Sequence, residues 1–109
     1  MEHRRYLTIE QRENLQRLLE ARAAQLRGEI GEDRLADLNA EPEAFSLERD
    51  VVEWRAIEAA LGRLHEPDFG LCADCDADIP YARLEANLGA TRCVACQAKA
   101  ERSKAGAPA

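Results

Sequence analysis

Four cysteines in one short stretch restrict the fold of this chain more than any other feature of its sequence. They form two pairs, Cys72-x-x-Cys75 and Cys93-x-x-Cys96, with seventeen residues between the pairs. This spacing is typical of a zinc finger in which two turns each provide two thiolates to one tetrahedral ion. The stretch is too short to bury a large apolar core, so metal binding would have to stabilise it. The sequence therefore predicts one structural Zn(II) per chain, held by these four cysteines.

Two disulfides or a dithiol redox centre are the alternative uses of such cysteine pairs. Disulfides suit a secreted chain, but the N-terminal residues carry charges and lack the apolar run of a signal peptide. A redox Cys-x-x-Cys normally uses one pair on an α/β fold. A catalytic zinc is disfavoured as well, because four protein ligands leave no open position for water or substrate. We therefore expect the function to depend on other parts of the chain.

The composition favours a helical, solvent-rich protein without a large globular core. Of the 109 residues, 33% are charged and only 5% are aromatic. The formal net charge is −6, and residues 31–50 contain seven acids and two arginines. An acidic chain without a basic stripe is poorly suited to binding DNA phosphates directly. No apolar run approaches the length needed to span a bilayer. We expect a cytoplasmic protein that binds neither DNA nor membranes.

Two stretches show the periodicity of amphipathic helices with a narrow apolar seam. The first extends from Thr8, which has the form of a capping box with Gln11, to about Ile30. The second begins near Ser46, a favourable N-cap, and ends at His65, before a Glu-Pro pair. The seam of this second helix repeats in steps of three and four residues and consists of Leu47, Val51, Trp54, Ile57, Leu61 and Leu64. The single tryptophan is therefore interpreted as a packing residue.

Similar lengths and a short connection predict that these two helices form an antiparallel hairpin. At 1.5 Å per residue, each helix spans about 30–35 Å. An acidic stretch bracketed by glycine and proline joins them, and the first helix either ends near Gly28 to Gly31 or continues weakly beyond. The hairpin is assigned to residues 8–66, with an acidic tip near residues 28–45. Residues 1–7 are expected to be flexible.

The rest of the chain is predicted to form a zinc-finger module at the base of the hairpin, in residues 67–103. Within it, Pro80 suits the first position of a short helix from Tyr81 to about Asn87. A last helix is expected to open at the second cysteine pair and to run to about Ser103.

Residues 104–109 are expected to be a disordered tail. The predicted fold class is mainly α: an antiparallel two-helix coiled-coil hairpin plus a small C4 zinc-finger module with short helices and a C-terminal helix.

Further motifs surround the cysteines. They are Ile57-Glu58-Ala59-Ala60-Leu61, Asp68-Phe69-Gly70 before the first pair, Ile79-Pro80, Arg83-Leu84-Glu85-Ala86, and Gln97 after the second pair. Together, over about residues 51–102, they resemble the DksA/TraR family of C4 zinc-finger proteins. The resemblance implies a bacterial regulator that binds RNA polymerase and inserts its hairpin into the secondary channel. Acidic tip residues would then approach the catalytic Mg(II), often in concert with the alarmone ppGpp.

The tip of this chain departs from the pattern best known in that family. Where the family has acid-x-x-acid-x-Ala, this chain has Glu29-x-x-Glu32-x-Arg34, with Asp33 adjacent. Carboxylates are natural neighbours of Mg(II), so Glu32 and Asp33 are the candidate polymerase-contacting residues. Arg49, near the same end of the hairpin, is the third candidate. A solvated acidic loop is the alternative interpretation.

The positions related to the alarmone also differ from the family. Alarmone-binding members carry basic residues at positions that align with Ala56, Asn87 and Gln97, and all three are uncharged here. Without cations, a tetra- or pentaphosphate lacks its charge-assisted partners. The resemblance is therefore to the short, TraR-like members, some of which act without the alarmone, and we expect no ppGpp binding.

No set of residues in the sequence indicates an enzyme. There is no Ser/His/Asp set, phosphate-binding glycine loop or paired-carboxylate motif. His65, seven residues before Cys72, is interpreted as a helix C-terminal residue and not as a zinc ligand. Two functions are weighed: a monomeric, zinc-binding transcription regulator that binds RNA polymerase without ppGpp, or a zinc-stabilised protein-interaction module without polymerase activity.

Overall fold

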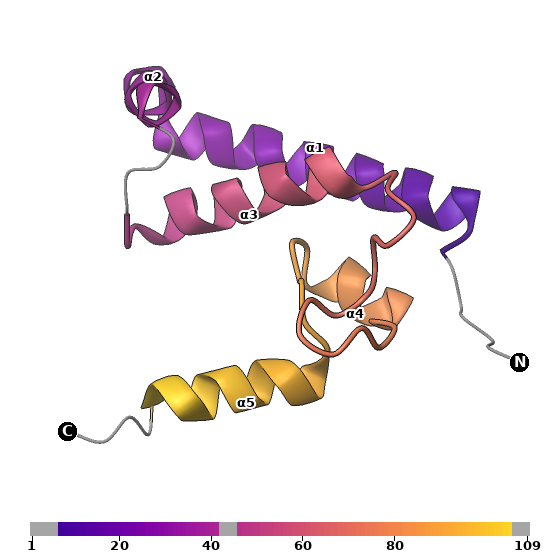
Figure 1. Ribbon diagram of the computed structural model, residues 1–109. Coiled ribbons are helices and arrows are strands. Elements are labelled where there is room, and N and C mark those ends of the chain that lie inside the picture. Colours follow the sequence, from indigo (N-terminus) through magenta and orange to yellow (C-terminus); the bar gives the residue numbers. More distant parts are fainter. Residues whose placement is uncertain (1–6, 42–45, 106–109) are drawn as a thin grey trace, which may run out of the picture.

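Two antiparallel helices form a hairpin, and a smaller helical module lies beside it (Figure 1). The computed structural model describes residues 7–41 and 46–105. Its helices, in chain order, are α1 (Ile9–Ile30), α2 (Glu32–Ala40), α3 (Arg49–Arg63), α4 (Tyr81–Ala86) and α5 (Val94–Ala105). Within the described ranges there is no named strand, only an isolated antiparallel bridge between Leu71 and Asp78. The mainly α fold class is confirmed, whereas residues 1–6 and 106–109, in the two ends expected to be flexible, lie outside the described residues.

The first turn of α1 has the predicted capping box. The Thr8 hydroxyl accepts a hydrogen bond from the Gln11 amide, and the Gln11 side chain accepts one from the Thr8 amide, both at 3.0 Å. These bonds satisfy amides that the start of a helix leaves without an intrahelical acceptor. Leu7, which was assigned to the flexible N-terminus, instead packs against the edge of the hydrophobic core.

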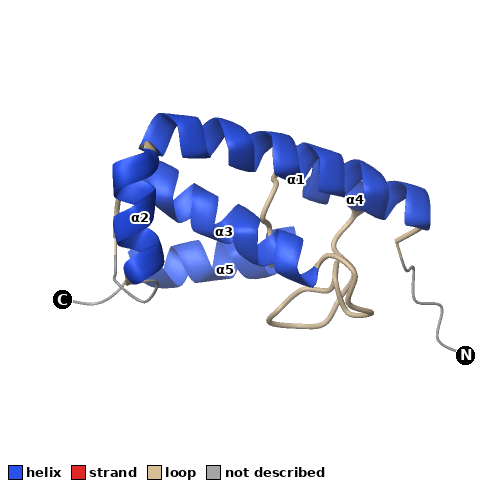
Figure 2. Ribbon diagram, turned by 90° about the horizontal axis from the view of Figure 1, so that it is seen from above, coloured by secondary structure: helices blue, strands red, loops and turns tan. Residues whose placement is uncertain are grey.

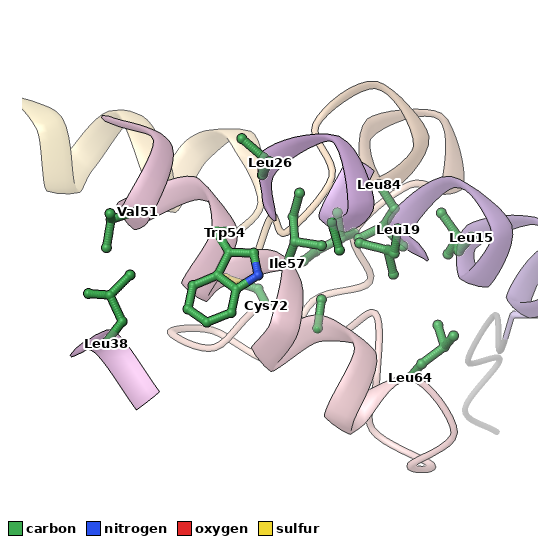
Figure 3. Close-up of a cluster of buried hydrophobic side chains, with 13 residues drawn as sticks. Leu15, Leu19, Leu26, Leu38, Val51, Trp54, Ile57, Leu64, Cys72 and Leu84 are labelled. Carbon is green, nitrogen blue, oxygen red and sulfur yellow. The ribbon is translucent and has the colours of Figure 1, made fainter. Parts of the chain in front are cut away.

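A continuous row of apolar side chains joins α1 to α3 (Figure 3). Every third or fourth residue of each helix is buried, as expected for a narrow seam between two helices. The buried residues of the pair are Leu15, Leu19, Ala23 and Leu26 from α1, and Val51, Trp54, Ile57 and Ala60 from α3, followed by Leu64. The interpretation of the tryptophan as a packing residue is confirmed, because only 9% of Trp54 is exposed.

Charged side chains connect the same two helices along the border of the seam. Arg22 makes two hydrogen bonds to the carboxylate of Glu53, each 2.7 Å long. Arg27 of α1 contacts Glu58 of α3 at 3.3 Å. Each of these pairs joins one residue of α1 to one residue of α3, so the pairs add polar contacts to the apolar seam.

The acidic tip is a separate helix, which the sequence did not predict. At Gly31 the chain leaves α1 with φ +92° and ψ 152°, and it then forms α2. Views from two sides show α2 crossing the end of the α1–α3 pair (Figures 1 and 2). The helix is held there by Leu38, of which only 4% is exposed and which lies beside Val51 and Trp54 (Figure 3). Residues 42–45 of the predicted tip lie outside the described residues.

The start of the second long helix also differs from the prediction. Glu48, not Ser46, is the N-cap residue, and α3 begins at Arg49. The Ser46 hydroxyl accepts a hydrogen bond from the Glu48 amide at 3.2 Å. This bond stabilises the turn that precedes α3 and does not cap the first turn of the helix. Leu47 was assigned to the buried seam, but 82% of it is exposed. The seam prediction was wrong at Leu47 because this residue precedes the helix and does not follow the helical period.

The zinc-finger module packs against the base of the hairpin through α4 and the turns around it. Leu84 of α4 and Ile79 before it are buried in the same core as the hairpin residues. Asn14 of α1 donates hydrogen bonds to the Tyr81 hydroxyl and to Glu85. These contacts set the module against α1, and α5 extends away from them on the other side of the module (Figure 1).

Candidate metal centre and acidic tip

The first cysteine pair lies in a tight turn between Leu71 and Asp78. The Cys72 amide donates to the Ala77 carbonyl at 2.7 Å, and the Asp76 amide donates to the Cys72 carbonyl at 3.0 Å. Asp76 has φ +63°, a left-handed conformation that aspartate tolerates better than most residues. This backbone turn directs both sulfurs of the Cys-x-x-Cys motif to one side.

The second pair lies at the start of α5, as predicted. The Gln97 amide donates to the Cys93 carbonyl at 2.9 Å, and the Cys96 amide lies 3.4 Å from the Cys93 sulfur. Cys93 therefore occupies the position before the helix, and Cys96 faces the same way from its first turn. Both sulfurs of this pair are therefore placed at the N-terminal end of α5.

The four sulfurs fit a tetrahedral zinc ion. All four Sγ atoms lie within 4.8 Å of one another, and Cys75 Sγ lies 3.8 Å from Cys93 Sγ. A tetrahedron with Zn–S bonds of about 2.3 Å has sulfur–sulfur edges of about 3.8 Å, so the spacing matches. A disulfide requires about 2.05 Å between sulfurs, and the four cysteines are free. Zinc would be held here as a structural ion with a closed set of ligands.

The thiols perturb one another strongly in this cluster. Backbone hydrogen bonds, chiefly from Cys93 and then from Asp74, lower the pKa of Cys72 to about 6. The side-chain hydrogen bond to Cys93 raises the pKa of Cys96 to about 12. Several thiolates so close together repel one another, and a divalent cation removes that repulsion. The donor set therefore suits a doubly charged soft-to-borderline metal such as zinc.

Contacts outside the sulfur cluster hold the two pairs together. The Ala73 amide donates to the Thr91 carbonyl at 2.8 Å, and Arg92 forms a 2.7 Å ion pair with Asp74. Arg83 of α4 donates to the Arg92 carbonyl at 3.1 Å. These contacts support the two cysteine pairs from outside the sulfur cluster. His65 is exposed, and the group of potential metal ligands found among the described residues consists of the cysteines alone.

The candidate polymerase-contacting residues lie at the opposite end of the hairpin. Glu32 and Asp33 occupy the first turn of α2 and are exposed, and Arg49 is the exposed first residue of α3. Acidic residues in a first helical turn are favoured by the helix dipole. Arg34, where the family pattern has alanine, forms an ion pair with Glu48. The sequence could not reveal this pair, since its partners are fourteen residues apart. Arg34 lies in α2, whereas Glu48 is the N-cap residue of α3.

A cavity between α3 and α5 brings together the three positions that the alarmone comparison singled out. It has a volume of about 730 Å³, and Ala56, Asn87 and Gln97 all line it. The cations among its lining residues are Arg83 and Arg92, and Arg92 is already paired with Asp74. Two acids, Glu53 and Glu101, also line the cavity. The cavity itself was not expected from the sequence, because no periodic pattern places α5 relative to α3.

Fold and site together define a class of protein: a helical hairpin with an acidic end, joined to a module that four cysteines close around one zinc ion. Comparison with known proteins gives the family. Residues 67–102 match the family described as prokaryotic dksA/traR C4-type zinc finger. The chain is 34% identical, over 113 aligned residues, to the RNA polymerase-binding transcription factor DksA of Salmonella typhimurium, covering 88% of this chain and 75% of the relative. The chain belongs to the DksA/TraR family.

Other relatives agree with this assignment. DksA of Escherichia coli K12 has the same identity and coverage, and that of Haemophilus influenzae is 39% identical over 61% of this chain and 49% of its own length. The solved structure of the RNA polymerase binding protein and transcriptional regulator Dks from Chlamydia trachomatis superposes with a TM-score of 0.65. It is 26% identical, and the match covers 94% of this chain and 99% of that one. No helix in residues 7–41 and 46–105 is long and apolar enough to cross a membrane.

Proposed function

We propose that this protein is a zinc-binding transcription regulator that binds bacterial RNA polymerase and modulates initiation. The hairpin would enter the secondary channel with its acidic end first, and the zinc-finger module would remain at the entrance. The relatives of similar sequence are named as RNA polymerase-binding transcription factors, and a structural relative is named as a polymerase-binding regulator. The protein would act as a monomer in the cytoplasm, by binding and without catalysing a reaction.

The observation that carries this proposal is the position of the exposed acids. α1 contains 22 residues and so is about 33 Å long. The zinc-finger module packs near its beginning, whereas Glu32 and Asp33 follow its end. An acidic group at the end of such a rod can reach a cationic site or a metal ion deep within a channel, and its charge favours the approach to a basic surface.

Transcription in vitro with purified polymerase tests the role of the tip. The full-length zinc-loaded protein is expected to co-purify with RNA polymerase and to change initiation at sensitive promoters. The double variant Glu32→Ala/Asp33→Ala is expected to bind polymerase but to lose most of this effect. Glu10→Ala/Glu13→Ala is the matched control, because it removes the same charge from exposed residues at the other end of α1.

Two results would contradict the proposal at different levels. Failure to bind polymerase at micromolar concentration would exclude the function as a polymerase-binding regulator. The second candidate, a protein-interaction module without polymerase activity, would then remain. Binding combined with an unchanged activity of the Glu32→Ala/Asp33→Ala variant would exclude only the assignment of the tip. One observation favours the second candidate, a protein-interaction module without polymerase activity. Where the family pattern has alanine, this chain has Arg34, which forms an ion pair with Glu48.

Regulation without ppGpp is part of the same proposal. The cavity that contains the aligned positions offers a polyphosphate few free cations, since Glu53 and Glu101 offset Arg83 and Arg92. We expect the effect on transcription to be the same with and without ppGpp. Placing cations by Ala56→Lys and Gln97→Lys is expected to create a dependence on the alarmone. A strong response of the unchanged protein to ppGpp, in a polymerase that lacks its own alarmone response, would exclude this part.

A further inference from the structure

The junction between α1 and α2 has unusual backbone geometry for two consecutive helices. Gly31 serves both as the C-cap of α1 and as the N-cap of α2, with φ +92° and ψ 152°. Residues other than glycine rarely occupy this region. A Cβ atom placed on Gly31 would meet nothing within 4 Å, so the surroundings leave room for a side chain. The bend therefore depends on the backbone conformation of one residue and not on the fit of its neighbours.

Among the described residues, apolar contacts and one exposed ion pair hold α2 in its bent position. Leu38 is the buried residue of this helix, and it lies at the tip end of the core beside Val51 and Trp54 (Figure 3). Leu35 of the same helix is partly buried against this core. An ion pair between Arg34 and Glu48 also links α2 to the start of α3, and both of its side chains are substantially exposed. Exposed ion pairs contribute little to stability, so Leu38 is the main anchor.

The bend also leaves backbone groups without helical partners. The Gly31 amide bonds to the Arg27 carbonyl at 2.9 Å, and the Leu35 amide bonds to the Gly31 carbonyl at 3.0 Å. Between them, the amides of the first turn of α2 lack an intrahelical acceptor, and no side chain caps them. If Gly31 took helical angles, these amides would bond to the carbonyls of the last turn of α1, and α1 and α2 would become one helix.

We propose that the acidic tip is a two-position element, in which α2 either packs across the hairpin end through Leu38 or straightens about Gly31 into a continuation of α1. The bent position gains the burial of Leu38, the partial burial of Leu35 and the Arg34–Glu48 pair. The straight position gains the missing backbone hydrogen bonds and relieves the conformation of Gly31. Because the gains of the two positions oppose each other, both positions are populated in the free protein.

The covalent chain permits this movement. Straightening would advance the end of α2 by about 14 Å, since the helix has nine residues. Nine peptide steps separate Ala40 from Arg49, and nine extended steps reach about 30 Å. The straight form would carry Leu38 out of the core and project the acidic residues of α2 beyond the end of α3. This gives the tip a variable reach, and the inference concerns the free protein, independently of whether polymerase is its partner.

Amide hydrogen exchange in the full-length zinc-loaded protein tests the proposal residue by residue. Gly31→Ala disfavours the bent backbone, and Leu38→Ala removes the anchor. In both variants the amides of Glu32, Asp33 and Arg34 are expected to become about tenfold or more slower to exchange, since they gain helical acceptors. In Gly31→Ala, which keeps Leu38, the emission of Trp54 is expected to shift to longer wavelength as Leu38 leaves it. Trp54 is the only tryptophan of the chain.

Two control variants separate this movement from general effects on helices. Gly28→Ala lies within α1 in both positions and has open space around it, and Asn39→Ala lies on the exposed side of α2. Neither is expected to change exchange at residues 32–34. The proposal is overturned if Gly31→Ala leaves those amides as fast as in the unchanged protein. It is also overturned if Leu38→Ala melts α2, with loss of helical chemical shifts over residues 32–40.

Discussion

The hairpin buries a row of side chains from two facing helices, whereas residues 67–102 bury only Cys72, Ile79 and Leu84. Both regions share one contiguous core, but their sources of stability differ. In the hairpin, hydrophobic burial along the seam supplies the cohesion. In the zinc-finger module, the buried residues are too few for that, and the metal has to supply it.

This difference shows how the molecule can hold the proposed polymerase-contacting residues far from its metal. The seam sets the length and the register of the α1–α3 hairpin, and the metal stabilises only the zinc-finger module at the base of the hairpin. A closed sulfur shell contributes no chemistry to the other end. The two regions meet at α4 and at the turn before α5, so the contacts there decide whether they unfold together or separately.

Loss of zinc is expected to have the largest effect and to divide the molecule at this border. Chelation, or the substitution Cys75→Ser, should unfold most of residues 67–102, because zinc contributes about 10–16 kcal/mol in small zinc domains. The α1–α3 seam should remain helical. A two-dimensional NMR spectrum would show collapsed signals for the module and dispersed signals for α1 and α3.

The control for the cysteine variant is Ala95→Ser, an exposed position of α5 beside the metal ligands. It is expected to bind one zinc ion per chain, as the unchanged protein does. Simultaneous loss of dispersed signals from both regions would show that they form one cooperative unit, and retention of the module without metal would refute the stabilising role of zinc.

Removing a buried side chain from the seam is expected to have the next largest effect. Ile57 is fully buried in the core, so Ile57→Ala should lower the free energy of unfolding by about 2–5 kcal/mol. Val52, on the same helix, is 51% exposed, and Val52→Ala should change it by about 0.5 kcal/mol or less. Urea denaturation of the zinc-loaded protein measures both. Equal effects at the two positions would mean that the seam does not hold the hairpin.

Much of the hairpin and of the metal site could be predicted from the sequence, because the sequence patterns that indicate them are local and periodic. The cysteine spacing identified the metal ligands, and the steps of three and four residues identified most of the seam. The capping box at Thr8 gave the start of α1 to the residue. These features depend on neighbouring residues along one helix or turn, so the fold can hardly override them.

The errors lie where long-range contacts decide the conformation. The segment of α2 is acidic and follows glycines, so the sequence left open whether the first helix continues into it; its position across the hairpin end depends on the burial of Leu38, a contact between distant parts of the chain. Leu47 matched the apolar period, yet the chain becomes helical only at Arg49. The cavity between α3 and α5 likewise depends on how the module packs, and no single segment encodes it.

The contact between the two regions can be tested at Gly89. This residue has φ +89°, and a Cβ atom there would lie 3.3 Å from the Ala56 Cβ and 3.5 Å from its carbonyl carbon. Gly89→Ala is expected to destabilise the protein by about 1–3 kcal/mol, because both the backbone conformation and the close approach to α3 oppose a side chain. Thermal unfolding of the zinc-loaded protein measures the effect.

The matched substitution is Gly62→Ala, which lies in α3 with nothing within 4 Å of its added Cβ. Here alanine is expected to stabilise the helix by about 0.5–1 kcal/mol. If Gly89→Ala lowers the stability and Gly62→Ala raises it, the border between hairpin and module lies at Ala56. A neutral result for Gly89→Ala would mean that the turn carrying Gly89 can move away from α3.

The smallest expected effect concerns the ion pair between Arg22 and Glu53 at the border of the seam. The hydrogen bonds from Arg22 lower the pKa of Glu53 below its ordinary value of 4.5. The pair therefore stabilises the folded state above that pH, and this stabilisation is lost as the pH falls through the lowered pKa. Both side chains are about one third exposed, so solvent screening limits the contribution to about 0.5–1 kcal/mol.

Glu53→Gln is expected to lower the free energy of unfolding by that amount at pH 7, and the difference from the unchanged protein should vanish as the pH falls through the lowered pKa of Glu53. Acid also releases zinc, since protons compete for the thiolates. The control is therefore Glu58→Gln, which retains the same metal site. It loses a longer and more exposed ion pair, the one with Arg27. Because zinc release is common to both proteins, it cancels in the comparison. A difference that persists below the lowered pKa of Glu53, where its carboxyl is protonated, would show that Glu53 stabilises the hairpin through packing and not through its charge.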